Sequence, residues 1–120
     1  MNQIYRNFAG SEEYSEESFI AKLHEENVWN DDEYFKLENA LYELCEANKG
    51  KEVIHRDVAW PVMRVFSYLM ISLSCQYDEN DSFEVKYLTR AQYYARRERL
   101  QLVFEGFFKG QMPSRKHLNY

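Results

Sequence analysis

Apolar residues recur at helical spacing in four stretches of the chain, and most of these stretches are bounded by helix start or stop signals. In the first stretch, Phe19 and Leu23 lie on one apolar face, and Ser15 precedes them in the position of a helix cap. These residues predict a short helix from Ser15 to about Asn27. Residues 1–14 show no such period, and we expect them to be irregular.

The second stretch has the clearest start signal in the chain. Asn30 can cap a helix, and Glu33 follows at the spacing that lets its side chain reach back to the backbone N–H of the cap. Apolar side chains then share one helical face at Tyr34, Leu37, Leu41 and Leu44. Because Gly50 can adopt the left-handed conformation that ends a helix, we expect this helix to end at Lys49 and Gly50.

The third stretch is the most apolar, which indicates the central helix of the fold. Its stripe consists of Val62, Val65, Phe66, Leu69, Met70 and Leu73, and Ile71 widens it. The sequence allows two starts for this helix. Asp57 can be the cap, or Trp60 can stand just before the helix with Pro61 in the first helical position, where proline is tolerated.

The fourth stretch begins with a capping box formed by Thr89 and Gln92 and ends at Lys109 and Gly110. One face of the predicted helix carries Tyr93, Leu100, Val103, Phe104 and Phe107. Before this helix, apolar and charged residues alternate over residues 83–87. This period of two predicts a short extended segment, and whether it pairs as a strand stays open.

Four helical stretches joined by short-to-medium connections predict a mainly all-α fold, a compact bundle of about four helices. The chain has 120 residues and no internal repeat, linker or low-complexity stretch, so we expect one domain over residues 1–120. Residues 114–120 carry no helical signal, and we expect them to be loosely held.

Charge is unevenly distributed along the chain, although the net charge is only −5. Residues 1–60 hold 14 acidic and 6 basic residues, a net charge of −8, whereas residues 61–120 hold 6 acidic and 9 basic residues, a net charge of +3. Such a one-sided field steers partners but does not specify a fold. A protein that tracks phosphates would normally carry the opposite overall sign. We therefore expect a binding protein, and an acidic surface suits a basic partner.

No motif for catalysis or metal binding accompanies this charge. The histidines and the two cysteines, Cys45 and Cys75, do not stand at spacings that place two ligands on one ion, so we expect no metal site. Both cysteines lie in apolar helical patterns, so we expect buried free thiols, and a disulfide between them is the open alternative. Neighbouring acidic residues point about 100° apart on a helix and do not by themselves form an acid–base pair. We expect no enzyme, no catalytic residue and no cofactor. A catalytic site assembled from distant residues is a separate hypothesis.

Two further absences bear on location. The N-terminal sequence lacks the layout of a signal peptide. No apolar run approaches the roughly 18 residues that a membrane span needs. We therefore expect a cytoplasmic protein without a membrane partner.

Four arginines crowd the first half of the fourth helix: Arg90, Arg96, Arg97 and Arg99. Arginine interleaved with tyrosine can stack on bases and bind nucleic acid. The same arginines can also form ion pairs with the acidic first half of the chain. The negative net charge favours internal ion pairs, and a nucleic-acid-binding helical module that uses these arginines is the alternative function.

Several strings of aromatic and acidic residues carry a family resemblance. They are YRNF at residues 5–8, YSEESF at 14–19, YFKLE at 34–38, WPVMR at 60–64, RERL at 97–100 and FEGFF at 104–108. Together they resemble family forty-one of the bacterial polymorphic-toxin immunity proteins, which includes contact-dependent growth-inhibition immunity proteins. The resemblance extends from Tyr5 to about Pro113. It implies a cytoplasmic protein that binds and blocks one cognate toxin domain, often a nuclease, without enzymatic activity or a cofactor.

The predicted toxin contact is an acidic surface around the starts of the first two helices and the turn between them. Its members are Glu12, Glu13, Glu16, Glu17, Glu25, Glu26, Asp31, Asp32 and Glu33, with Trp29 and Tyr34 as neighbouring aromatic anchors. Acidic side chains can compete for the positive groove in which a nuclease holds phosphates, and they accelerate encounter with it. The oligomeric state stays open between monomer and dimer.

Overall fold

The computed structural model describes residues 1–76, 84–118 and 120, and within them it contains helices and no strand. The helices are α1 (Asn2–Arg6), α2 (Phe19–Glu26), α3 (Asp31–Ala47), α4 (Arg56–Ser74), α5 (Arg90–Lys109) and a short 3₁₀ helix, η1 (Arg115–His117). The all-α prediction is confirmed, with four longer helices as expected and the short α1 in addition. None of the described helices combines the length and the apolar character that a membrane crossing requires.

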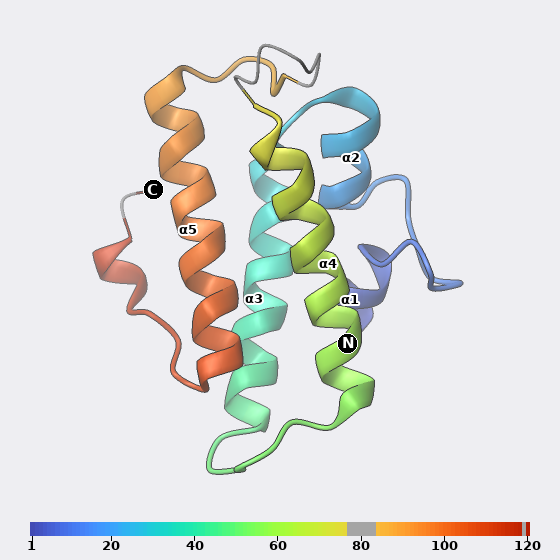
Figure 1. The fold of residues 1–120 in the computed structure, drawn as a ribbon, viewed down its shortest axis with the longest axis vertical. Coiled ribbons are helices and arrows are strands. Elements are labelled where there is room, and N and C mark those ends of the chain that lie inside the picture. Colours follow the sequence, from blue (N-terminus) through green and yellow to red (C-terminus); the bar gives the residue numbers. More distant parts are fainter. Residues whose placement is uncertain (77–83, 119) are drawn as a thin grey trace.

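The three long helices, α3, α4 and α5, lie side by side along the length of the molecule, and α1 and α2 lie beside α4 (Figure 1). α3 contacts α1, α2 and α5, while α4 contacts α1 and α2. The core contains fully buried side chains from α2 to α5, such as Leu23, Leu37, Leu69 and Phe104. Phe66 of α4 stacks on Phe104 of α5 with ring centroids 4.9 Å apart, so aromatic packing joins these two helices.

Three predicted helix boundaries are confirmed. The Asn30 side chain accepts a hydrogen bond from the backbone N–H of Glu33 (2.9 Å). Thr89 and Gln92 form the reciprocal capping box, with hydrogen bonds of 3.1 and 2.9 Å. Gly110 ends α5 with a positive φ of 79°. The carboxylate of Glu33, in contrast, does not return to Asn30 but pairs with other side chains.

The predicted start of α2 at Ser15 is wrong. The helix begins at Phe19, and its cap is Ser18, whose buried side chain accepts a hydrogen bond from a backbone N–H of the first turn (3.2 Å). Asn7 satisfies a second N–H of this turn, because its Oδ1 accepts a hydrogen bond from Ile20 (2.9 Å). Contacts with a distant part of the chain therefore help to select the cap.

The expectation of an irregular N-terminus is also wrong over residues 2–6, which form α1. Ile4 is fully buried, and α1 contacts both α3 and α4. A helix of this length is too short to leave a periodic signal or to be stable alone. Packing against the body of the protein explains its formation.

Neither predicted start of α4 is correct. His55 is the cap, since its ring Nδ1 accepts a hydrogen bond from the N–H of Asp57 (3.1 Å), and the helix begins at Arg56. Pro61 therefore lies inside the helix, where it has no N–H to donate to the preceding turn. The additional turn before Pro61 places Trp60 on a helical surface.

The first residue of the predicted extended segment lies outside the described residues, and residues 84–87 form no strand. Two hydrogen bonds hold this connection against the body. The N–H of Val85 donates to the side-chain oxygen of Gln76, and the N–H of Lys86 donates to the carbonyl of Asn27, each at 2.8 Å. The described part of the segment is thus an irregular connection tied to the ends of α2 and α4.

The prediction of a loose C-terminal tail is wrong for its described part. Gly106 permits a close approach of the chain after α5, because a Cβ at this position would lie 2.8 Å from the ring of Pro113. The Tyr42 hydroxyl donates to the carbonyl of Pro113 (2.6 Å), and Arg115 donates to the side chain of Asn39 (2.7 Å). These contacts hold the chain after α5 against α3.

Candidate functional site

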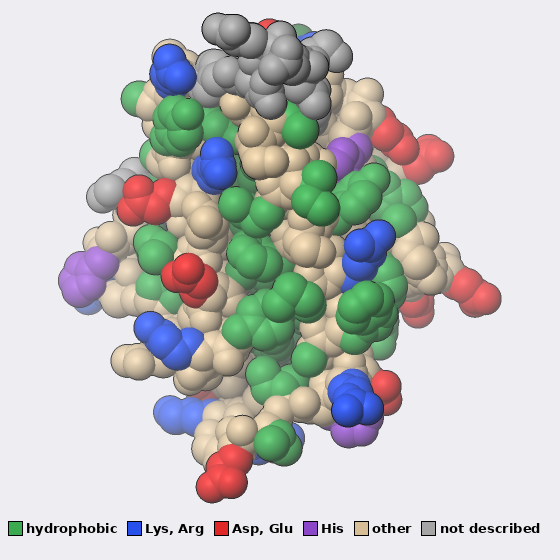
Figure 2. Space-filling view, in the orientation of Figure 1, with side chains coloured by type: hydrophobic (Ala, Val, Ile, Leu, Met, Phe, Trp, Pro, Cys, Tyr) green, Lys and Arg blue, Asp and Glu red, His purple; other side chains and the backbone are tan. Residues whose placement is uncertain are grey.

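Acidic side chains project from the edge of the molecule that carries α2 and the segment before it (Figure 2). Those exposed there are Glu12, Glu13, Glu16, Glu17, Glu25 and Glu26, a set that we call the acidic edge. Glu17 pairs with Lys22 at 3.2 Å, yet its side chain retains 75% of its accessible surface. Asp32, at the start of α3, is exposed as well. These carboxylates face solvent, as a contact with a partner would require.

Two acids of the predicted contact have internal partners. Glu33 is buried and accepts hydrogen bonds from Arg6 (3.0 Å) and Lys36 (2.9 Å). Burial raises the pKa of Glu33, but the hydrogen bonds and charges of Lys36 and Arg6 outweigh this effect and hold the pKa below its usual value. Asp31 pairs with Arg96 of α5 at 3.2 Å. Both acids therefore contribute to the fold.

The predicted aromatic anchors, Trp29 and Tyr34, are buried in the core. Both rings pack edge-on against Phe19, with centroid distances of 4.9 and 5.4 Å. The indole N–H of Trp29 donates to the Tyr120 hydroxyl (3.2 Å), and the Tyr34 hydroxyl donates to Glu38 (3.0 Å). Because the rings and their polar atoms are already occupied, neither residue is presented to a partner. Tyr34 lies on the apolar face of α3, whereas Trp29 lies in the connection between α2 and α3.

Two of the four arginines on α5 pair with acids inside the fold. Arg99 makes a bidentate ion pair with the buried Glu38, with N–O distances of 2.7 and 2.8 Å, and these hydrogen bonds raise the pKa of Arg99. Arg96 is also paired, as described above. The internal ion pairs that the sequence favours are confirmed for these two residues. The nucleic-acid alternative therefore loses two of its four arginines to the fold.

His24 and Ser72 form the arrangement that comes nearest to a catalytic pair. The Ser72 hydroxyl oxygen lies 3.2 Å from Nδ1 and 3.1 Å from Nε2 of His24. Because the two distances are nearly equal, the hydroxyl is not aligned with the lone pair of either ring nitrogen. It donates instead to the carbonyl of Tyr68 (3.1 Å). Burial lowers the pKa of His24, and no carboxylate among the described residues pairs with its ring. In a catalytic triad a carboxylate orients the histidine ring, and no carboxylate of the described residues does so for His24.

One protein-family model matches the chain, that of immunity protein 41, over residues 6–111. The chain belongs to the immunity protein 41 family. The matched range contains α2, α3, α4 and α5 and includes the acidic edge. An immunity family implies neutralisation of a cognate toxin, and its members are generally inhibitors without enzymatic activity. No curated protein and no solved structure matches the chain.

Within the described part of this immunity protein, metal ligands are not brought together. No group of three or more His, Cys, Asp or Glu side chains there could hold an ion. Cys45 and Cys75 are not joined in a disulfide, and both are half-buried rather than fully buried as expected. The thiol of Cys75 donates to the carbonyl of Ile71 (3.4 Å).

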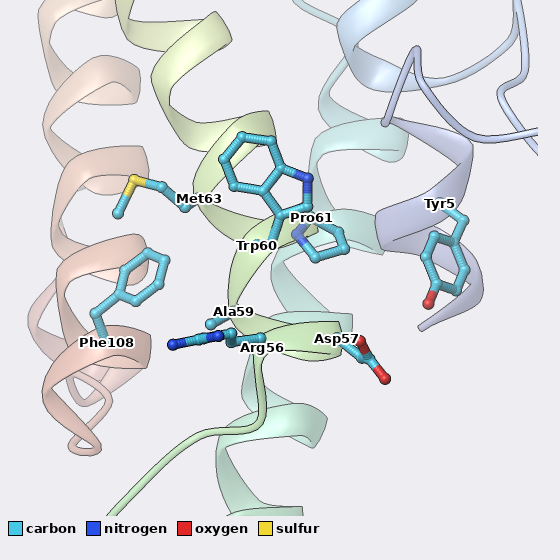
Figure 3. A pocket seen from close by; sticks show the side chains of 8 residues that line it. All are labelled: Tyr5, Arg56, Asp57, Ala59, Trp60, Pro61, Met63 and Phe108. Atoms are coloured by element: carbon cyan, nitrogen blue, oxygen red, sulfur yellow. The ribbon is translucent and has the colours of Figure 1, made fainter.

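Sequence reasoning missed an exposed apolar surface at the start of α4. Trp60 is 60% exposed and Met63 is 41% exposed, and apolar side chains gather over α4 and α5 on the face shown in Figure 2. Together with Tyr5 of α1 and Phe108 of α5, they surround a groove of about 950 Å³ (Figure 3). The sequence signal is a set of large apolar residues outside the core stripe of α4. It becomes visible only when the helix begins before Pro61.

Proposed function

We propose that this chain binds one cognate toxin domain in the cytoplasm and neutralises it, in the manner of contact-dependent growth-inhibition immunity proteins. Membership of the immunity protein 41 family is the observation that carries this proposal. Inhibition needs no reaction and no cofactor, because a protein that occupies the working surface of a toxin blocks it by binding alone.

The acidic edge favours a nuclease as the toxin. A nuclease holds phosphates in a positively charged groove. The six glutamates of the acidic edge are exposed, and one of them has an ion-pair partner among the described residues. Oppositely charged surfaces associate faster by about 10- to 1,000-fold than uncharged ones. Fast association suits an inhibitor that must act before damage accumulates.

Exposed charges at an interface contribute more to the rate of encounter than to its final affinity. The acidic edge would therefore guide the toxin domain toward the chain. Affinity would come from side chains that lose their water on binding. Because Trp29 and Tyr34 are buried, such side chains have to lie elsewhere on the surface.

Co-purification tests the proposal directly. The probe is the C-terminal domain of the protein encoded immediately upstream, expressed together with this chain. We expect a stable complex and protection of cells that produce the toxin domain. We also expect the chain to stop degradation of DNA or RNA by that domain. Absence of a complex at micromolar concentrations would contradict toxin binding, whereas a complex without nuclease activity would contradict only the assigned toxin class.

A further inference from the structure

Trp60 exposes 60% of its surface at a helical position that the core does not use. A tryptophan side chain is usually largely buried. Met63 and Phe108 lie to one side of Trp60 and Tyr5 lies to the other, so three helices contribute to this surface (Figure 3). The groove of about 950 Å³ around Trp60 is large enough for several side chains of another molecule.

Two arginines flank Trp60 along α4. Arg56 stands four residues before it and Arg64 four residues after it, so all three share one face of the helix. Both arginines are exposed, and no carboxylate of the described residues lies within ion-pair distance of either. Asp57 lies 3.5 Å from the ring of His55, and its side chain points away from Arg56 (Figure 3). The guanidinium of Arg64 lies over the ring of Tyr68, 5.9 Å from its centroid. An apolar anchor therefore lies between two exposed cations whose charges no carboxylate of the described residues pairs.

We propose that this surface holds a segment of the cognate toxin that presents an apolar side chain between carboxylates. We call it the α4 face. It consists of five residues that line the groove, Tyr5, Arg56, Trp60, Met63 and Phe108, and of Arg64, which lies beyond the groove on the same face of α4 and lines a neighbouring hollow. The inference rests on the proposed function, because it assigns the part of the chain that retains the toxin. Tryptophan, methionine and arginine are enriched at protein interfaces, and tryptophan and arginine are frequent hot spots. The two arginines would form ion pairs with carboxylates of the bound segment.

A second copy of this chain is a poorer occupant of the α4 face. A two-fold contact centred on Trp60 would bring the same surface of both copies together. With the two α4 helices antiparallel, Arg56 of each copy would meet Arg64 of the other. Like charges in such positions oppose association. A toxin segment with carboxylates meets no such opposition.

The α4 face and the acidic edge would contribute differently to one complex. Charges at the acidic edge act mainly on the association rate, while an anchor that loses its water, with its flanking arginines, acts mainly on the dissociation rate. A toxin domain with a cationic groove and an acidic, apolar segment beside it would engage both regions. Contacts of opposite sign at two places would also fix its orientation.

Two variants test the α4 face, with biolayer interferometry against the C-terminal domain of the protein encoded immediately upstream. Trp60→Ala removes the anchor, and we expect binding at least about 30-fold weaker, mostly through faster dissociation. Arg56→Glu/Arg64→Glu reverses both charges and keeps the anchor, and we expect a loss of at least about tenfold. Tyr87→Ala and Lys116→Glu change exposed residues elsewhere and are the matched controls, with binding within about threefold of wild type.

The outcomes separate this inference from the proposed function. Wild-type binding that both α4 variants retain within about threefold would overturn the inference and leave toxin neutralisation intact. Absence of wild-type binding would overturn both. A wild-type dimer in sedimentation experiments that Trp60→Ala dissociates, with toxin binding unchanged, would assign the α4 face to a second copy and overturn the inference. Circular dichroism of the variants, which alter exposed side chains only, verifies that each is folded.

Discussion

Acidic residues in the first half of the chain occupy two contrasting environments. Glu38, Glu33 and Asp31 lie in or against the core, and each forms an ion pair with an arginine. The glutamates of the acidic edge are exposed, and within the described part of the chain Glu17 is the one that forms an ion pair, with Lys22. The same type of side chain therefore stabilises the fold at one place and stays available to a partner at the other.

This contrast shows that the charge of a chain segment is not the charge it offers to a partner. The net charge of −8 over residues 1–60 includes acids that Arg96 and Arg99 of the second half neutralise. The charge that remains is concentrated at α2 and the segment before it. Stability and recognition should consequently respond to different substitutions.

Removal of Glu38 should cause the largest loss of stability. Glu38→Ala leaves Arg99, whose side chain is 7% exposed, without its bidentate partner, and removal of one member of a buried pair costs about 3–5 kcal/mol. Urea unfolding followed by circular dichroism measures this free energy. Glu43→Ala, at an exposed position of α3, is the matched control and should cost less than about 0.5 kcal/mol. Equal stability of the two variants would contradict a structural role for the pair.

Replacement of both partners sharpens the same comparison. Glu38→Met/Arg99→Met removes the two buried charges together, and it should recover much of the stability that Glu38→Ala loses. Such recovery would show that the loss comes from an uncompensated charge. No recovery would show that two other contacts of Glu38 matter more than the balance of charge with Arg99: the hydrogen bond that the Tyr34 hydroxyl donates to it, and its ion pair with Arg115.

Glu33→Gln should have a smaller effect, about 1–2 kcal/mol, because the amide keeps the volume and some hydrogen bonding. This effect should depend on pH. Since the pKa of Glu33 is lowered in the folded state, its contribution to stability is complete above the usual pKa of 4.5 and is lost as the pH falls through the folded value. Urea unfolding of wild type and variant between neutral and acidic pH measures the difference. A difference that does not shrink in acid would contradict the ion pairs of Glu33.

Local signals in the sequence predict the parts of the fold that depend on neighbouring residues. The caps at Asn30 and Thr89 are correct because helix geometry itself places a side chain near the N–H three residues later. The core stripe of α4 is also correct, since Val62, Val65 and Leu69 are buried. These features need no knowledge of the rest of the chain.

Contacts between distant residues decide the parts that the sequence did not predict. Ser18 rather than Ser15 caps α2 in a site that Asn7 completes. The ion pair of Glu38 and Arg99 joins residues 61 positions apart, so no local pattern reveals it. The sequence predicted that arginines of the last helix form ion pairs within the fold. It did not predict which acidic residues are their partners.

The candidate site was predictable to a similar degree. The exposure of the acidic edge agrees with the polar positions of its residues in the sequence. The burial of Tyr34 was predictable, because Tyr34 shares the apolar face of Leu37, whereas no local pattern marks Trp29, between α2 and α3, as a core residue. The exposed Trp60 was missed because Pro61 suggested a helix start, whereas His55 is the cap and the helix begins at Arg56, about one and a half turns earlier.

Tyr120→Phe tests the link between Asp31 and the C-terminal tail, with an expected loss of about 1 kcal/mol. The substitution removes the hydroxyl that donates to Asp31 and accepts from Trp29, while the ring can remain over Arg96, 4.1 Å from its guanidinium carbon. Thermal unfolding compares it with Tyr87→Phe, a control at a position that is 88% exposed. Identical behaviour of the two variants would show that the tail does not stabilise the internal acids.

The acidic edge should show the smallest effect on stability. Glu12→Lys/Glu13→Lys/Glu16→Lys changes exposed residues, and the free energy of unfolding should change by less than about 0.5 kcal/mol. Association with the toxin domain should instead slow by about tenfold at low salt. The difference from wild type should fade as added salt shortens the range of the charges, to about 8 Å at physiological ionic strength. Stopped-flow mixing over a salt series measures this rate.

A second triple variant separates the position of the acidic edge from its charge. Glu43→Lys/Glu46→Lys/Glu105→Lys makes the same change in net charge at exposed positions of α3 and α5. If the edge guides the toxin, this control should slow association much less than reversal of the edge itself, because surface charges beyond the screening length of about 8 Å contribute little. Equal slowing by both triples would assign the steering to net charge alone. The proposal that the acidic edge guides the toxin would then be wrong, although the structural role of Glu38 would be unaffected.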